Sequence, residues 1–138
     1  MVFMSLDEPS PAGAHVPMQV NMGAITIPVR VASQERRMIL DTGATFSYIN
    51  SAITTGMTPI ETITDFSPLA EGQFDTPIFE IESELADVKF ACRYGNLPKN
   101  IELMIQMLGT EGVIGYDLLA SCKLMICVRD SRMLVLHN

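Results

Sequence analysis

The sequence predicts a mostly β, closed-barrel-like fold with one or two short helices. Apolar and polar residues alternate over residues 15–31, as in strands with one buried face, because successive side chains of a strand point to opposite sides of the sheet. Two short glycine-containing motifs occur at Asp41–Ala44 and Gly112–Leu119. The end of the chain is hairpin-like, with apolar stretches at 124–128 and 133–137 around Asp130-Ser131. These observations together favour a β fold.

Length and composition indicate a single folded domain. The chain has 138 residues, of which 48% are hydrophobic and 18% are charged, which argues against a disordered chain. We predict a flexible N-terminal tail over residues 1–13, where Asp7–Gly13 is polar and rich in breakers, and one domain over residues 14–138. No apolar run is long enough to span a bilayer and no signal peptide is visible, so we expect a cytoplasmic protein. A periplasmic or secreted location would require that a signal segment had been removed.

The net charge and the few cysteine and histidine residues argue against nucleic-acid binding, membrane binding and metal binding. The net charge of −7 argues against nucleic acid and against an anionic membrane surface as partners. Cys92, Cys122 and Cys127 are odd in number and lack the spacing of a zinc knuckle, so we expect buried thiols in a reducing compartment. His15 and His137 lie near the termini and form neither a Cys–His pair nor a metal cluster. We therefore predict no cofactor and no metal.

The expected elements follow from hydrophobic periodicity and from turn residues. A turn at 21–23 separates two alternating strands, and a turn at 32–35 leads into the strand Arg37–Leu40, which ends at Asp41. The next elements expected are a short strand at Tyr48-Ile49, a helical turn at Ser51–Ile53, a hairpin over 60–81 that turns at Ala70–Gly72, and a strand at Val88–Tyr94.

The β pattern is interrupted at residues 98–108. Leu97, Ile101, Met104, Ile105 and Leu108 recur at helical spacing, Pro98 suits a first helical turn, and Gly109 is a stop signal. This spacing predicts a short amphipathic helix. A strand at Val113-Ile114 and a short helix at Asp117–Cys122 are expected next.

Asp41-Thr42-Gly43-Ala44 is the candidate catalytic site. The carboxylate of Asp41 follows a buried-looking strand and lies on a sharp turn next to a hydroxyl. Thr42 can donate its hydroxyl proton into the supporting frame, and Gly43 exposes a backbone N–H to the carboxylate without a side chain in the way. A catalytic aspartate needs such a fixed position and room for a substrate backbone, so we predict catalytic roles for Asp41, Thr42 and Gly43.

Both motifs resemble those of a known family. The stretch Ile39–Ile49 resembles the active-site segment of retroviral-type, or retropepsin-like, aspartic proteases, and Gly112–Leu119 is similar to the apolar-apolar-Gly-x-Asp-x-Leu segment that closes the same fold. Each motif occurs once, in the family's order. The resemblance implies an acid-protease fold with a strand behind the catalytic turn, a flap hairpin over 60–81, and hydrolysis of a polypeptide substrate.

Aspartic proteolysis needs two carboxylates that share one proton, and this chain offers one candidate. The segment at Asp130 lacks the glycine, Asp117 begins a predicted helix as a cap, and Asp65 and Asp75 are expected to be solvated on the flap. We therefore predict a homodimer in which Asp41 of each chain meets at a two-fold axis. Thr42 from each chain could bond across that axis, as in the family. The expected interface contains the Asp41–Ala44 turn and terminal strands such as Met133–His137.

Substrate subsites are expected to be apolar and to lie near the turn and the flap. The candidate lining residues are Ala44, Phe46, Glu71, Gly72, Ile114 and the flap-side stretch from Phe66 to Phe74. We expect the ten methionines to be core filler and not a substrate surface.

The chain departs from the viral pattern in three ways. The flap tip has Glu71 and a single Gly, Tyr116 stands where viral enzymes usually have Arg, and the helix at 98–108 is an insertion relative to the small viral enzymes. The insertion suggests a cellular, bacterial relative.

Two alternatives to catalysis remain open. The fold could serve as a non-catalytic peptide-binding or dimerisation module, because extended edges and a groove suit strand addition. Asp41 could also simply cap a tight turn in a β-barrel without chemistry. The intact Asp41-Thr42-Gly43 sequence favours catalysis.

Overall fold

The computed structural model describes residues 2–3, 14–21, 24–41, 43–67, 72–85, 88–116, 122–127 and 132–137. The structure is mainly β with two short helices, as predicted. In chain order the elements are β1 (Val2–Phe3), β2 (Ala14–Pro17), β3 (Gln19–Asn21), β4 (Ala24–Val31), β5 (Gln34–Leu40), β6 (Ser47–Ile49), α1 (Ser51–Thr54), β7 (Glu61–Ser67), β8 (Gly72–Leu85), β9 (Val88–Gly95), α2 (Lys99–Met107), β10 (Gly112–Ile114), β11 (Cys122–Cys127) and β12 (Arg132–His137).

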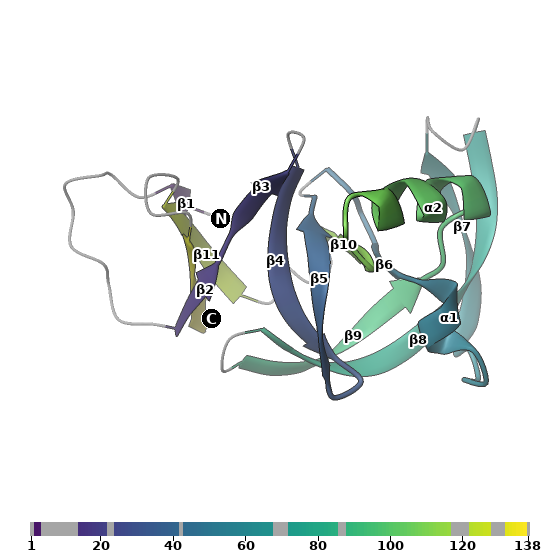
Figure 1. Cartoon of the computed structure of the whole chain (residues 1–138). Coiled ribbons are helices and arrows are strands. Elements are labelled where there is room, and N and C mark those ends of the chain that lie inside the picture. The colour runs from purple at the N-terminus through teal and green to yellow at the C-terminus, as the bar shows by residue number, and fades with distance from the viewer. Residues whose placement is uncertain are drawn as a thin grey trace.

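A ring of hydrogen-bonded strands forms the body of the molecule (Figure 1). An eight-stranded sheet has the order β3-β4-β5-β10-β6-β9-β8-β7, and the pairing of Arg30 and Val31 in β4 with Glu84 and Ser83 in β8 closes it on itself. The main core lies inside this ring. Ile27, Val29 and Val31 of β4 are buried there, which confirms the alternation expected for this strand.

The short strand β10 is inserted between β5 and β6. It runs parallel to β5, with Gly112 opposite Met38, and antiparallel to β6, with Gly112 opposite Ile49. A Cβ on Gly112 would lie 2.3 Å from the carbonyl oxygen of Tyr48 and 2.6 Å from Cε of Met38. Only a residue without a side chain lets β10 pack this closely, so the glycine fixes the strand behind the Asp41 turn.

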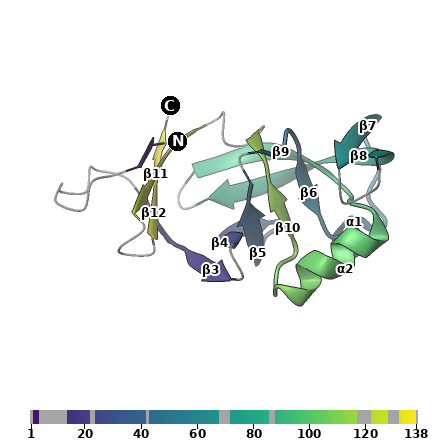
Figure 2. The same cartoon turned by 90° about the horizontal axis from the view of Figure 1, so that it is seen from above.

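A second, four-stranded sheet joins the two ends of the described chain, in the order β1-β11-β12-β2. In Figures 1 and 2 it lies at the opposite end of the molecule from α2 and the β7–β8 hairpin. The antiparallel β11–β12 pair confirms the predicted C-terminal hairpin. Val2 and Phe3, placed by the sequence in a flexible tail, pair in parallel with Met125 and Ile126. No local signal could reveal this strand, because its partner lies at the other end of the chain.

Most of the remaining elements match their predictions with shifted ends. β8 extends to Leu85, and α2 begins at Lys99 with Pro98 as its N-terminal cap residue. Cys122, predicted to end a helix, begins β11, and the rest of that expected helix lies outside the described residues. The predicted turn residues Met22 and Gly23, as well as Asp117, Asp130 and Ser131, also lie outside them. Neither described helix is long and apolar enough to cross a membrane.

Candidate active site

The Asp41 turn begins where β5 ends. The backbone N–H of Asp41 donates to the carbonyl oxygen of Ile114 at 3.0 Å, and the N–H of Ala44 donates to the Asp41 carbonyl oxygen at 3.2 Å. The N–H of Gly43 donates to Oδ1 of Asp41 at 3.0 Å, which confirms the predicted bond. Asp41 is exposed, so its carboxylate is held by the turn yet open to a ligand. Thr42 lies outside the described residues.

The second motif supports this turn from behind. The N–H of Gly115 donates to the buried hydroxyl of Ser47 at 3.0 Å, and the N–H of Tyr116 donates to the carbonyl oxygen of Ala44 at 2.7 Å. A Cβ on Gly115 would lie 2.3 Å from the Phe46 carbonyl oxygen, so this position also requires glycine. The motif thus fixes both ends of the Asp41–Ala44 segment through backbone contacts.

A cavity of about 670 Å³ opens beside Asp41. Its floor is the outer face of the ring, where Ile39 of β5, Val113 of β10 and Tyr48 of β6 lie side by side. Asp41, Gly43, Ala44 and Thr45 form one edge, and the β7–β8 hairpin and α2 form the walls. The catalytic candidate therefore borders a largely apolar space that is large enough for side chains of a ligand.

The helix α2 supplies the largest part of the lining. Its contribution, with the residues at its ends, consists of Leu97, Ile101, Met104, Ile105, Met107 and Leu108. Helical spacing predicted the helix but could not show that its apolar face borders a cavity. Met104 and Met107 are 50% and 87% exposed and line the cavity, so they are not the core filler expected of the methionines, whereas Met18 and Met38 are buried in the core.

A buried carboxylate anchors α2 to the body. Glu102 is 2% exposed, and its Oε1 accepts hydrogen bonds from the Ser51 hydroxyl at 2.8 Å and from the Ser51 N–H at 3.3 Å. Lys99 lies 3.8 Å from the same oxygen. This contact joins α2 to the first residue of α1, so the apolar wall of the cavity is held at a fixed position relative to β6.

The β7–β8 hairpin contacts Tyr48 through two residues that face each other across its strands. Asp65 and Phe74 are cross-strand partners, and both line the cavity with Phe66. The Tyr48 hydroxyl donates to the Asp65 carboxylate, and the rings of Tyr48 and Phe74 lie 6.1 Å apart. Asp65 is therefore half-buried, because its side of the hairpin faces Tyr48. The prediction that Asp65 would be solvated is wrong.

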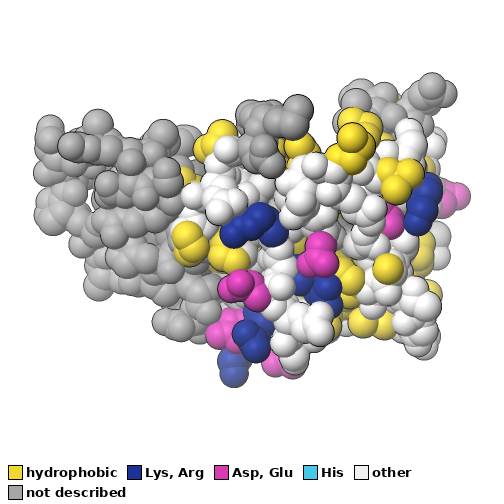
Figure 3. All heavy atoms as spheres, in the orientation of Figure 1, with side chains coloured by type: hydrophobic (Ala, Val, Ile, Leu, Met, Phe, Trp, Pro, Cys, Tyr) yellow, Lys and Arg dark blue, Asp and Glu magenta, His cyan; other side chains and the backbone are white. Residues whose placement is uncertain are grey.

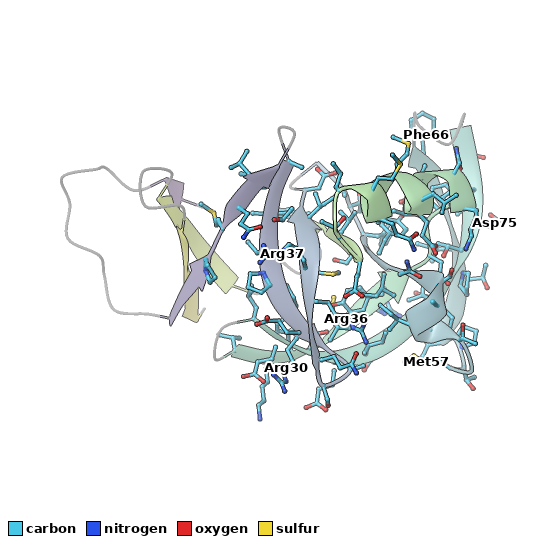
Figure 4. All side chains as sticks on the ribbon, in the orientation of Figure 1. Arg30, Arg36, Arg37, Met57, Phe66 and Asp75 are labelled. Carbon is cyan, nitrogen blue, oxygen red and sulfur yellow. The ribbon has the colours of Figure 1, made fainter. Side chains whose placement is uncertain are left out.

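The neighbouring acidic residue of the hairpin behaves differently. Asp75 is exposed, accepts a hydrogen bond from the Thr64 hydroxyl at 2.5 Å, and does not line the cavity. Figure 4 shows it on the outer side of β8, whereas Phe66 lies above α2 in this view and lines the cavity together with residues of that helix. The expected solvation of Asp75 is confirmed.

The predicted substrate-binding residues divide into three groups. Ala44, Phe66 and Phe74 line the cavity. Phe46 and Gly72 do not line it, and Ile114 is fully buried in the main core, because adjacent residues of β10 point to opposite sides and Val113 faces the cavity instead. Glu71 lies outside the described residues.

Among the cysteines, the structure describes the side chain of Cys92. Cys92 is buried in β9, with its Sγ 3.9 Å from the carbonyl oxygen of Arg93. Across the described segments, no three His, Cys, Asp or Glu side chains are grouped so that they could hold a metal ion. The side chains of Cys122 and Cys127 lie outside the description.

The ring of strands, with β10 inserted behind the Asp41 turn, is the fold of the retropepsin-like aspartic proteases. The structure is similar to the crystal structure of a retropepsin-like aspartic protease from Rickettsia conorii, with a TM-score of 0.60 and 13% identity over 94% of this chain and 96% of that chain. It is also similar to the solution structure of the simian foamy virus protease, with a TM-score of 0.51 and 12% identity over 69% of this chain and 91% of that chain. No family model and no curated protein matches the sequence.

Proposed function

We propose that the protein is an aspartic endopeptidase that hydrolyses peptide bonds with water. The observation that carries this proposal is Asp41, an exposed carboxylate fixed by the Gly43 N–H at 3.0 Å and open to a cavity of about 670 Å³. The similar solved structures are proteases, which supports the same activity. The substrate would be a polypeptide with apolar side chains.

The second carboxylate is proposed to come from a second copy of the chain. Among the residues that line the cavity, Asp41 is the carboxylate that lies on the glycine-containing turn. Because one carboxylate cannot act as acid and base in the same step, a second such turn is needed. In a two-fold dimer, one Asp41 would take a proton from the attacking water while the other, protonated, gives its proton to the scissile carbonyl oxygen. Tyr116, which is 62% exposed and donates its N–H to the Ala44 carbonyl oxygen, would lie close to this axis because it follows the Asp41 turn so closely in space.

The β7–β8 hairpin is proposed to act as the flap. It contacts the body through Tyr48 and forms a wall of the cavity opposite the floor of Ile39 and Val113. A peptide between hairpin and floor would place its apolar side chains against α2. The contacts of Tyr48 with Asp65 and Phe74 would then position the hairpin over the substrate.

The deciding experiment is the substitution Asp41→Asn, assayed on a peptide library from acidic to neutral pH. Cleavage should fall by about a thousandfold, because the amide cannot act as a base. Asp75→Asn is the matched control, since it removes an exposed carboxylate that does not line the cavity. Cleavage that survives Asp41→Asn, or that a metal chelator blocks, would reject the mechanism. Peptide binding without cleavage by the wild type would instead indicate a binding module.

A further inference from the structure

The cavity contains a second carboxylate that the proposed reaction does not use. Among the described residues that line it, the charged ones are Asp41 and Asp65, and the others are mostly apolar. Hydrophobic side chains gather over α2 and the nearby part of the β7–β8 hairpin, at the upper right of Figure 3. A ligand side chain that enters here would meet apolar surface and negative charge.

The carboxylate of Asp65 is held in place from both sides. One oxygen accepts from the Tyr48 hydroxyl, and Oδ1 accepts from the N–H of Phe66 at 2.8 Å. Tyr48 is 4% exposed, and its ring is tilted against that of Phe74, so the donor itself has little freedom. Since a carboxylate offers about four acceptor positions, Asp65 retains capacity for a further donor.

The surroundings of Asp65 increase the effect of its charge. Coulomb interactions near apolar, partly desolvated surface are several times stronger than those in bulk water. No lysine, arginine or histidine is among the described lining residues, so no protein cation there compensates the charge of Asp65. A cationic ligand group would gain an ion pair, and an anionic group would be repelled.

Resting on the proposed function, we propose that Asp65 is a specificity determinant of the cavity. It selects peptides that carry Lys or Arg close to the large apolar side chain bound against α2, and it rejects peptides with Asp or Glu at that position. The hydrogen bond from Tyr48 orients the carboxylate for this role. The hairpin thereby contributes charge selectivity, and α2 contributes apolar surface.

The substitution Asp65→Asn separates charge from position. An asparagine can keep both contacts without the negative charge, because its oxygen can accept from the Phe66 N–H and its NH2 group can donate to the Tyr48 hydroxyl oxygen. Asp75→Asn is the matched control, because it removes one charge from the same hairpin at an exposed site outside the cavity. A cleaved apolar peptide is varied at each flanking position with Lys, Gln and Glu, and kcat/KM is measured at low ionic strength.

At one of the flanking positions of the peptide, kcat/KM of the wild type should be about tenfold higher with Lys than with Glu. This ratio corresponds to one close charge pair near the surface. Asp65→Asn should reduce this ratio to about twofold, and Asp75→Asn should leave it within about twofold of the wild-type value. An equal loss in both variants would show a general effect of net charge and overturn the proposal. An unchanged ratio in Asp65→Asn would show that Asp65 only holds the hairpin.

Binding to the Asp41→Asn protein keeps this test independent of catalysis. Fluorescence anisotropy measures the affinity of the Asp41→Asn protein for the labelled Lys and Glu peptides, and the Lys peptide should bind about tenfold more tightly. This difference in affinity should be lost in the double variant Asp41→Asn/Asp65→Asn. A wild type that does not cleave, with a binding preference that depends on Asp65, would reject the protease and leave this inference standing. Cleavage without charge preference would reject only the inference. Failure to bind either peptide, with no cleavage, would reject both.

Discussion

The backbone N–H of Asp41 donates to the carbonyl oxygen of Ile114 at 3.0 Å. This single bond joins the two motifs that are far apart in the sequence, and the parallel pairing of Leu40 with Ile114 precedes it. The carboxylate-bearing turn is therefore a continuation of the strand pairing and not an independent loop. Its position depends on how closely β10 and Gly115, the residue after it, can approach the turn.

Gly115→Ala should destabilise the protein by about 2–3 kcal/mol, because forced overpacking must displace backbone. The added Cβ would meet the Phe46 carbonyl oxygen at 2.3 Å and its carbon at 2.7 Å. Gly43→Ala is the comparison for stability, since its Cβ would meet Oδ1 of Asp41 at an ordinary 3.4 Å. Urea denaturation measures both, and equal stability of the two variants would contradict the packing argument.

Tyr48→Phe should loosen the β7–β8 hairpin. The variant keeps the ring beside Phe74 but loses the hydroxyl that donates to Asp65, at a cost of about 1 kcal/mol. Hydrogen exchange of the β7 amides should become faster, and peptide KM should rise. Thr64→Val removes a side-chain bond within the hairpin, to Asp75 at 2.5 Å, between two residues that do not line the cavity. If Thr64→Val raises KM as much as Tyr48→Phe, the contact with Tyr48 has no special role.

Met104→Ala should change which apolar side chain the site accepts. Met104 and its neighbour Leu103 are both 50% exposed, but only Met104 lines the cavity. Truncation removes apolar contact worth about 1 kcal/mol, so kcat/KM for peptides with the preferred side chain should fall about fivefold. The kcat/KM for peptides with larger side chains should rise, because the truncation leaves more space. Leu103→Ala is the control and should leave the preference unchanged. The cleavage preferences of both variants are measured with a peptide library. A change in Met104→Ala alone would show that Met104 contacts the substrate side chain, whereas the same change in both variants would show a general effect on the helix.

Specific activity should rise with protein concentration if two Asp41 carboxylates form the site. The net charge of −7 per chain opposes association, and salt screens this repulsion, so the dimer should strengthen as ionic strength increases. Sedimentation across concentration at low and moderate salt, run beside the activity assay, measures both effects. A monomer that cleaves with unchanged specific activity at high dilution would show that the second carboxylate comes from the same chain.

Local patterns predicted most of the fold correctly. The alternation of Ile27, Val29 and Val31, the strand before Asp41 and the helix around Ile101 and Ile105 were all visible in the sequence, because periodicity reports which side of an element is buried. The bond from Gly43 to Asp41 was predictable for a different reason, since it joins two residues of one short turn. Features that depend on contacts between distant segments were not visible.

The sequence by itself determined the mostly β character, the order of the elements from β4 to β10 and the identity of the candidate catalytic carboxylate. Only the tertiary structure decided that Asp65 faces Tyr48 and that Val113, and not Ile114, borders the cavity. It also decided that α2 forms the apolar wall. Hydrophobic periodicity shows which face of an element is buried, but it does not show which other element covers that face. The covering element depends on how the ring of strands closes and on the close packing of Gly112 in β10 and of Gly115 just after it.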